Sequence, residues 1–363
     1  MPTQEKSPSL DPPHTVAPGS APPAIRAEGL YKVFGKRPEN VVRQLEDGAS
    51  TEDVAAQGVT PAVIDAEFEV RPGEIFVVMG LSGSGKSTLI RMLNGLLSPS
   101  AGHVHVGGSD VAGLDAKGLR TLRSEEMSMV FQHFALLPHR SVLDNAGYAL
   151  KVRGVDKQTR TQQARDALDM VGLSGWEDKL PSQLSGGMKQ RVGIARALAA
   201  ETDIMLMDEA FSALDPLIRR EMQDQLLDLQ QRLSKTIVFI THDLNEAMRL
   251  GDRIAVMRAG RIVQIGTAEE ILRAPATDYV AEFVKDVDRT RVLTAGSVMT
   301  PVPSDAPGDY TPVAADTLLA DLFAMAGTAR LPLAVLDGEN RMLGVIEEAQ
   351  LLHAMAGQEA HHG

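Results

Sequence analysis

One stretch of the chain combines the residue types that hold phosphate groups. Residues 80–88 read G-L-S-G-S-G-K-S-T, which fits the pattern G-x-x-x-x-G-K-[ST]. The glycines let the backbone curl until its N–H groups point at an anion, Lys86 would reach the outer phosphates, and the Ser87 hydroxyl would bind Mg²⁺. The predicted nucleotide-binding residues here are Gly80, Ser82, Gly83, Ser84, Gly85, Lys86, Ser87 and Thr88.

The flanking residues supply the elements that must position this loop. An apolar run at 74–79 predicts a short strand, and residues 87–97 carry apolar residues at helical spacing. A helix that starts at the loop would direct the positive end of its dipole at the phosphates. The alternative is a chance glycine-rich turn, which the strand before it and the helix after it argue against.

Two adjacent acids follow another apolar run and could complete the chemistry. Residues 204–207 read I-M-L-M and predict a buried strand, after which come Asp208 and Glu209. Asp208 would hold Mg²⁺ through water, and Glu209 would orient or deprotonate the attacking water. A solvated strand end is the alternative for this pair.

Gln132 and His242 end two further predicted strands, 127–131 and 236–240. An open α/β sheet builds its sites at such strand ends. Gln132 could touch both the metal shell and the attacking water, and His242 could contact the γ-phosphate, although a single histidine is more often structural. The candidate catalytic residues are therefore Gln132, Glu209 and His242, and the candidate metal ligands are Ser87, Gln132 and Asp208.

A second glycine-led helix start follows at residues 184–191, which read L-S-G-G-M-K-Q-R. It offers a second anion-binding helix N-terminus, and one nucleotide in a single chain has no evident need for both. The geometry that uses both is a head-to-tail dimer. In it, Ser185 to Gly187 of one subunit would cover the γ-phosphate held by the loop of the other.

The remaining pattern predicts an α/β fold. Helices alternate with continuous apolar strands, which is typical of a mostly parallel sheet covered on both faces. We expect strands at 25–34, 63–70 and 102–107, helices at 159–171 and 192–200, and a hairpin formed by 253–257 and 261–265. Between the first two strands, Ser50 and Asp53 form a capping box that predicts an inserted helix.

Composition limits the function classes. The chain has 363 residues, 44% of them hydrophobic and 23% charged, so two or three ordinary globular domains are expected. A net charge of −12 argues against nucleic-acid binding, and the lack of cysteine excludes disulfides and cysteine zinc sites. We find neither a signal peptide nor an apolar run near the ~20 residues that span a bilayer. A soluble or peripheral protein of the cytoplasm is expected.

Composition also suggests domain boundaries. Residues 1–24 are rich in Pro, Ser and Ala and predict a disordered leader, and 25–284 form the main domain. Residues 285–315 are predicted to be a linker. Residues 316–356 have a helix-strand-strand-helix pattern and predict a small α+β domain.

Taken together, these motifs resemble the ATP-binding cassette (ABC) ATPases. The resemblance covers residues 25–275 with the motifs in order, and it implies a P-loop NTPase fold with a RecA-like core sheet and a helical subdomain at about 133–190. It also implies a homodimer closed by ATP, and that Phe34 stacks on adenine; from the sequence alone, Phe34 could equally pack in the core. The implied trans ATP contacts are Leu184, Ser185, Gly186, Gly187 and Gln190, and the implied D-loop is Ser212, Ala213, Leu214 and Asp215.

A narrower resemblance is to the glycine betaine/proline osmoprotectant importer ATPases. It is carried by the stretches at 30–39, 80–88, 130–139, 207–219 and 241–255 and by the inserted helix. It implies that transmembrane permease subunits bind this chain directly and that a substrate-binding protein is an indirect partner. It also implies a peripheral location at the cytoplasmic face of the membrane and a C-terminal CBS module. The tail has room for only one CBS-like unit.

The segment after Gln132 is the predicted permease-docking site, through Phe134, Leu136 and Leu137. Apolar residues beside a site-proximal glutamine could form an exposed partner groove. Simple core packing is the alternative for all three.

Other functions remain to be weighed against an importer ATPase. A soluble ABC protein of DNA repair or translation would need two cassettes or a long coiled coil, and a GTPase would need an N-K-x-D or T-K-x-D motif, none of which occurs. A regulator that binds ATP without turnover conflicts with the intact Lys86, Asp208, Glu209 and His242. An importer for a different small polar solute stays open, as do glycine betaine, choline, carnitine and proline as substrates.

Overall fold

The computed structural model describes residues 22–301, 310–326 and 332–356. The predicted leader therefore lies outside the described residues except for its last three positions. Of these, Ala24 donates its N–H to the carbonyl of Val70 at 2.9 Å, which continues the pairing of the first two strands.

The main sheet has six strands in the order β10-β9-β3-β8-β7-β6. Their bounds are β3 Ile75–Met79, β6 Met127–Val130, β7 Ile204–Asp208, β8 Thr236–Thr241, β9 Arg253–Arg258 and β10 Arg261–Gly266. All are parallel except β10, which forms an antiparallel hairpin with β9. The predicted mostly parallel sheet is confirmed, and its continuous apolar strands β3, β7 and β8 are buried along their whole length.

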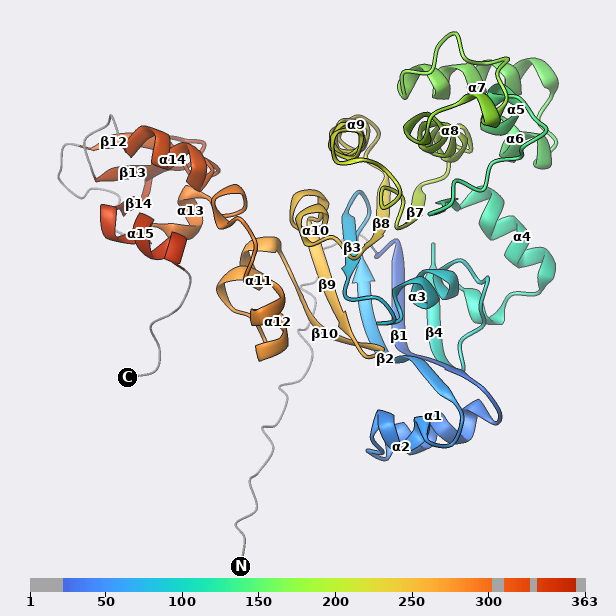
Figure 1. The fold of residues 1–363 in the computed structure, drawn as a ribbon, viewed down its shortest axis with the longest axis horizontal. Coiled ribbons are helices and arrows are strands. Elements are labelled where there is room, and N and C mark those ends of the chain that lie inside the picture. Colours follow the sequence, from blue (N-terminus) through green and yellow to red (C-terminus); the bar gives the residue numbers. More distant parts are fainter. Residues whose placement is uncertain (1–21, 302–309, 327–331, 357–363) are drawn as a thin grey trace, which may run out of the picture.

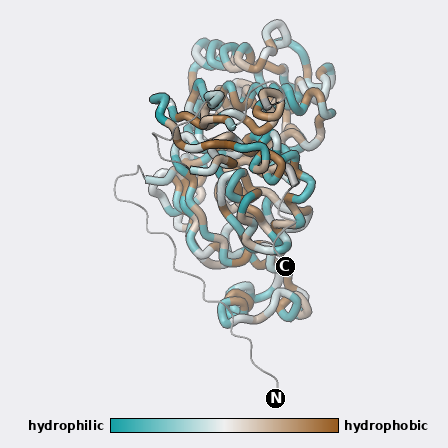
Figure 2. The backbone as a smooth tube through the Cα atoms, turned by 90° about the vertical axis from the view of Figure 1, so that its left-hand side faces the viewer, coloured by the Kyte–Doolittle hydropathy of each residue, from teal (hydrophilic) through white to brown (hydrophobic). Residues whose placement is uncertain are grey.

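Side chains that alternate along β3 enter two different cores. Val77 and Met79 belong to a cluster shared with the helices, whereas Phe76 and Val78 belong to a cluster shared with the second sheet. Figure 2 shows hydrophobic stretches running through the interior of the molecule and hydrophilic ones at many of its turns. Both faces of the sheet are therefore covered, and the ends of its strands are the places where side chains can form a site.

The second sheet is antiparallel, in the order β2-β1-β4-β5. Its strands are β1 Ile25–Phe34, β2 Thr60–Val70, β4 Ala101–Val106 and β5 Ser109–Asp110. The insertion between β1 and β2 forms α1 Pro38–Glu46 and α2 Thr51–Ala55, at the bottom of Figure 1. The predicted cap is present, since Ser50 Oγ accepts the N–H of Asp53 at 3.0 Å.

Four helices form a separate lobe at the upper right of Figure 1. They are α5 Val142–Ala146, α6 Tyr148–Val152, α7 Lys157–Met170 and α8 Gly186–Ala199, in the region predicted as a helical subdomain. Ala164, Ala167 and Leu168 form the buried face of α7, as their spacing predicts. The helix predicted at 192–200 begins earlier, at Gly186, because Ser185 caps it.

The remaining helices of the main domain lie along the sheet or beyond its last strand. They are α3 Lys86–Leu93, α4 Ala116–Glu125, α9 Pro216–Leu233, α10 Leu244–Leu250, α11 Ala268–Arg273 and α12 Asp278–Phe283. Within the described residues, no helix combines the length and hydrophobicity that a bilayer crossing requires.

A third sheet, in the order β11-β14-β13-β12, forms the C-terminal lobe at the left of Figure 1. Its elements are α13 Ala295–Val298, β11 Thr300–Pro301, β12 Thr311–Ala314, α14 Leu319–Ala326, β13 Leu333–Leu336, β14 Met342–Ile346 and α15 Glu348–Ala356. The predicted helix-strand-strand-helix order is present.

The predicted linker at 285–315 is wrong for most of its described length. Leu293 and Ala295 are buried in the core, Thr294 forms a β-bridge with Leu318, and β11 and β12 are strands of the third sheet. The Pro- and Gly-rich composition reflects short elements joined by turns. The C-terminal lobe therefore begins near residue 294.

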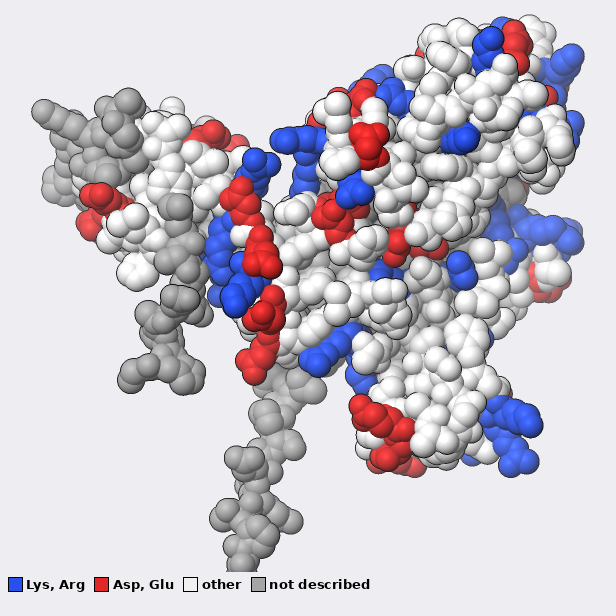
Figure 3. All heavy atoms as spheres, viewed as in Figure 1, with Lys and Arg blue, Asp and Glu red and all other residues white. Residues whose placement is uncertain are grey.

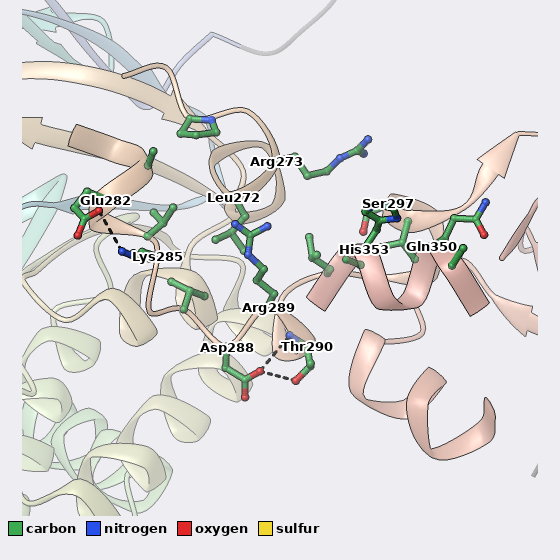
Figure 4. A pocket seen from close by; sticks show the side chains of 18 of the residues that line it. Leu272, Arg273, Glu282, Lys285, Asp288, Arg289, Thr290, Ser297, Gln350 and His353 are labelled. Atoms are coloured by element: carbon green, nitrogen blue, oxygen red, sulfur yellow. Dashed lines mark hydrogen bonds and ion pairs between the residues drawn. The ribbon is translucent and has the colours of Figure 1, made fainter. Parts of the chain in front are cut away.

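A cavity of about 1000 Å³ lies between this lobe and the main domain. Figure 4 shows Leu272 and Arg289 on one side and Gln350 and His353 of α15 on the other. Acidic and basic side chains lie close together at the junction (Figure 3). Lys285 Nζ, for example, lies 3.7 Å from Glu282 Oε2 (Figure 4).

Candidate nucleotide-binding and hydrolysis site

The phosphate loop joins β3 to α3 and is enclosed by strands far away in the sequence. A Cβ at Gly80 would overlap the carbonyl oxygen of Met257, and one at Gly85 would overlap that of Ala62. Both glycines also have positive φ, +155° and +103°. The turn between β9 and β10 closes the loop, because Gly260 donates its N–H to the carbonyl of Ser84 at 3.1 Å.

Lys86 is held at the centre of this loop. Its Nζ donates to the carbonyls of Gly80 at 2.8 Å and Leu81 at 3.0 Å, and the residue is only 4% exposed. Burial lowers the pKa of the Lys86 ammonium, and the Glu209 and Asp208 carboxylates oppose that shift. The ammonium is therefore preorganised beside the space that the loop encloses.

The loop also presents polar groups suited to an anion. The buried Ser84 Oγ has no hydrogen-bond partner among the described residues, whereas Ser82 and Gly83 are exposed. Thr88 is half-buried on the first turn of α3. An unpaired buried hydroxyl beside a glycine cradle fits a phosphate group.

A pair of oxygens lies between the loop and β7. Ser87 Oγ donates to Asp208 Oδ1 at 3.0 Å, and Arg91 Nη2 is 4.0 Å from Asp208 Oδ2. Burial raises the pKa of Asp208, and the hydrogen bond from Ser87 opposes that shift. A hydroxyl next to a carboxylate is a donor set that suits Mg²⁺, so these residues fit the predicted metal.

Three strand ends converge on the Glu209 carboxylate. Gln132 Nε2, after β6, is 3.1 Å from Glu209 Oε2, and His242 Nδ1, after β8, is 3.2 Å from the same oxygen. The backbone of Glu209 has φ +45°, an uncommon conformation for this residue type, and its N–H bonds to the carbonyl of Ile240 at 3.0 Å. The structure therefore brings together all three predicted catalytic residues.

The turn between β7 and α9 contains the four residues predicted as the D-loop. Gln132 Nε2 is 3.4 Å from Ser212 Oγ, which itself donates to the Glu209 carbonyl at 2.9 Å. Leu214 is buried, Ala213 is exposed, and Asp215 caps α9 by accepting the N–H of Ile218 at 3.1 Å. This turn is therefore tied to the convergent carboxylate site.

Phe34 is accessible at the end of β1. Its ring is 41% exposed, which removes core packing as the explanation, and Lys32 Nζ is 5.3 Å from the ring centroid. Phe34 pairs with Thr60 of β2, the strand whose Ala62 touches the phosphate loop. The aromatic ring thus lies on a strand pair that borders the loop.

Comparison with known proteins agrees with this arrangement. The ABC transporter family profile matches residues 63–212. The glycine betaine transport ATP-binding protein OpuAA of Bacillus subtilis is 44% identical over 94% of this chain and 94% of its own length. The trimethylamine N-oxide transport system ATP-binding protein TmoW of Ruegeria pomeroyi is 45% identical over 93% of this chain and 96% of its own.

A solved structure agrees as well. The dimeric ATP-binding cassette MJ0796, in a post-hydrolysis state bound to ADP and Pi, has a TM-score of 0.57 and 29% identity, covering 67% of this chain and 98% of that one. The chain belongs to the family of ABC transporter ATP-binding proteins. It is therefore an ABC-type ATPase.

The second glycine-led helix start of this ABC ATPase, at residues 184–191, lies in the helical lobe, away from the phosphate loop of the same chain (Figure 1). Ser185 and Gly186 are exposed at the start of α8, and Ser185 Oγ accepts the N–H of Met188 at 3.3 Å. A Cβ at Gly187 would lie 2.6 Å from Cγ2 of Ile218 on α9. One chain alone therefore does not bring its two glycine-led helix starts together.

Two of the residues predicted to contact ATP in trans, Leu184 and Gln190, are buried within this chain. Gln190 is 0% exposed, and neither of its amide atoms has a partner among the described residues. Leu184 is buried in the core of the helical lobe. Gln190 is one of the buried residues of α8, together with Ile194 and Ala197, so the side chains of Gln190 and Leu184 both pack inside this chain.

The predicted docking segment is shaped by two side chains that the sequence analysis did not single out. Arg196 donates to the carbonyls of Phe134 at 3.2 Å and Ala135 at 2.7 Å. Asn145 accepts the N–H of Leu137 at 2.7 Å and donates to its carbonyl at 3.1 Å. Phe134, Leu136 and Leu137 are all half-buried, and Leu136 also packs against the core, as the core-packing alternative expects.

Proposed function

We propose that this chain is the ATP-hydrolysing subunit of an importer for glycine betaine, proline or a related quaternary amine. The convergence of Gln132 and His242 on Glu209 is the observation that carries the hydrolytic part. The substrate class is supported by two relatives of similar identity, OpuAA for glycine betaine and TmoW for trimethylamine N-oxide. Both solutes carry three methyl groups on one nitrogen, and a different small polar solute is the alternative.

The loop residues would bind the nucleotide phosphates, with Lys86 supplying charge and Ser84 and the backbone N–H groups supplying donors. Ser87, Asp208 and Gln132 would hold Mg²⁺, which when bound neutralises part of the phosphate charge. Phe34 would stack on the adenine ring from the exposed end of β1.

Glu209 would act as the general base. Glu209 accepts a hydrogen bond from Gln132 Nε2, so a neutral amide would orient its carboxylate to take up a proton from water. His242 Nδ1 lies beside the same Glu209 oxygen, and the His242 side chain is 53% exposed. The imidazole ring could therefore rotate toward a phosphate group while its backbone stays at the end of β8.

Glu209→Gln tests this proposal. The amide keeps the shape of the carboxylate but cannot accept the proton, so turnover should fall by about 10² to 10⁴ while ATP affinity stays within twofold. ATPase assays and nucleotide titration of the purified chain measure both. Glu125→Gln, at an exposed position of α4, is the control. Turnover near the wild-type rate in Glu209→Gln would remove the catalytic assignment.

We further propose a homodimer of this chain as the active state. The exposed Ser185 and Gly186 would cover the γ-phosphate bound by the partner subunit, with the 212–215 turn beside them, and the solved relative MJ0796 is described as dimeric. Transmembrane permease subunits would then hold the dimer peripherally at the cytoplasmic face of the membrane, and a substrate-binding protein would act indirectly. Docking would use the segment that carries Phe134 and Leu137.

The C-terminal lobe is proposed to be a CBS-like unit that pairs with its copy and regulates by self-association or a small ligand; a purely structural dimer brace is the alternative. Residues 296–363 contain nine acids and two bases, a net charge of −7, which disfavours docking to anionic lipid. Transport over a salt series, with and without anionic lipid, would be compared for the full chain and a truncation at about residue 290. A salt response that needs both the lobe and anionic lipid would contradict this proposal.

A further inference from the structure

A cluster of polar side chains joins α9 to α10 behind the catalytic strand ends. We call Arg219, Gln223, Asp243 and Glu246 the α9–α10 cluster. Arg219 Nη1 donates to Asp243 Oδ2 at 3.0 Å, and its Nη2 donates to the carbonyl of Leu214 at 3.2 Å and lies 3.5 Å from that of Ser212. One guanidinium therefore binds both the turn after β7 and the first residues after β8.

Glu246 anchors the other side of the cluster. It is 3% exposed, its Oε2 accepts from Thr241 Oγ1 at 2.6 Å, and its Oε1 accepts from Gln223 Nε2 at 3.1 Å. Arg219 Nε lies 3.9 Å from the same Oε1. Burial raises the pKa of Glu246, and this guanidinium is the cation that offsets the cost of an ionised carboxylate there.

The residues that the cluster holds flank the catalytic groups. Thr241 and Asp243 are the two neighbours of His242, and the N–H of Asp243 donates to Thr241 Oγ1 at 2.9 Å. On the other strand end, Ser212 contacts both Gln132 and the Glu209 backbone. Among the described residues, no hydrogen bond or ion pair of Arg219 reaches the Glu209 carboxylate or the His242 ring, so its influence on them must pass through the two turns.

We propose that Arg219 is a positioning residue for ATP hydrolysis, which fastens the 212–214 turn to the turn that presents His242. The planar guanidinium reaches a carboxylate from one nitrogen and backbone carbonyls from another, and this fixed fork sets their spacing, which a single ammonium nitrogen does not do. With this link intact, residues 212–215 keep a fixed position relative to the Glu209–His242 pair. The proposal rests on the proposed hydrolytic function and adds to it a residue that contacts no reacting atom.

Arg219→Ala in the full chain provides the first test. Turnover at saturating ATP should fall at least tenfold, while the dissociation constant for ATP stays within twofold because the phosphate loop is untouched. Arg220→Ala is the matched control, since Arg220 is the next residue of α9, is exposed, and its side chain makes no hydrogen bond or ion pair within the described part of the chain. An unchanged turnover in Arg219→Ala would overturn the proposal.

A second variant separates positioning from folding. Removing Arg219 leaves the buried Glu246 without its cation, which by itself lowers stability. The double variant Arg219→Ala/Glu246→Gln removes that buried charge, so its melting temperature should return close to that of the wild type while turnover remains at least tenfold low. If turnover recovers together with stability, Arg219 only braces the fold and the proposal fails.

The conservative variant supplies a further check. Arg219→Lys keeps the positive charge but loses the fork, so its turnover should be intermediate, with no change in ATP affinity. Full wild-type turnover in this variant would show that the positive charge suffices and that the fork has no role.

The outcomes also separate the two proposals. A fully active Glu209→Gln removes the hydrolytic assignment. An inactive Glu209→Gln together with a fully active Arg219→Ala/Glu246→Gln removes only the role of Arg219.

Discussion

The two glycine-led helix starts, before α3 and at α8, share a composition but lie in opposite environments. Around the first, backbone carbonyls from β2 and β9 leave no room for a Cβ, and Lys86 is buried inside. At the second, Ser185 and Gly186 are exposed, and the closest approach to Gly187 comes from the flexible Ile218 side chain. The first site is enclosed by residues of its own chain, whereas the second is an exposed surface, which in the proposed dimer would meet the nucleotide of another chain.

Lys86→Ala attacks the complete site and should have the largest effect on the isolated chain. Loss of a charge-assisted contact to phosphate, worth about 2–3 kcal/mol, should weaken ATP binding roughly 100-fold. Titration with a fluorescent nucleotide measures this. Lys189→Ala on α8 is the control, because it removes the same charge at the other helix start. Equal affinities for Lys86→Ala and wild type would show that the loop assignment is wrong.

Gly186→Asp attacks the incomplete site and should leave ATP affinity unchanged. The position has open space around it, since a Cβ would meet only Leu214 Cδ2 at 3.9 Å, and an acid suits the first turn of a helix. Stability should therefore change by less than about 0.5 kcal/mol. The added negative charge would face the partner's γ-phosphate in the dimer.

The readouts for Gly186→Asp are turnover and ATP-dependent dimerisation, the latter measured by size exclusion in the Glu209→Gln background. We expect turnover to fall about 100-fold and the dimer to be lost, because several kcal/mol of like-charge repulsion oppose closure. If the chain hydrolyses ATP at the wild-type rate with this substitution, the second helix start has no role in trans, and the proposed difference between the two helix starts is wrong.

Leu137→Glu should have the smallest effect on the isolated chain. ATP affinity and basal turnover should stay within twofold, while transport by the complex with the permease is lost. Leu136→Glu is the contrasting variant, because Leu136 is half-buried like Leu137 but also packs against the core, so a charge there should lower the stability more than a charge at Leu137. A similar drop in melting temperature for both variants would favour core packing of the whole segment.

The sequence was most informative where burial is continuous. Strands such as β3 and β8 were predicted within a residue or so, because parallel strands buried on both faces are written as uninterrupted apolar runs. The phosphate loop and the strand-end residues Gln132 and His242 followed from their position relative to those runs.

Side chains that act through distant backbone could not be predicted. Arg196 binds carbonyls about 60 residues away, and nothing in its local sequence marks that partner. The burial of Gln190 depends on the rotation of α8 against its neighbours rather than on residue type. The misassigned linker has a related cause, since its residues pair with residues that come later in the chain, as in the bridge between Thr294 and Leu318.

The turn at Gly260 has a consequence for biosynthesis. Its N–H binds Ser84 and its carbonyl binds Ile64, so the phosphate loop is completed by residues about 175 positions downstream. Contacts of such sequence separation form late, after the intervening chain has been made and folded. A nascent chain that has emerged only as far as the acids after β7 contains every residue of the loop but not its closing turn. We therefore expect a nascent chain that ends after β7 to bind nucleotide more weakly than one that includes the turn between β9 and β10, so that ATP stabilises the longer chain more.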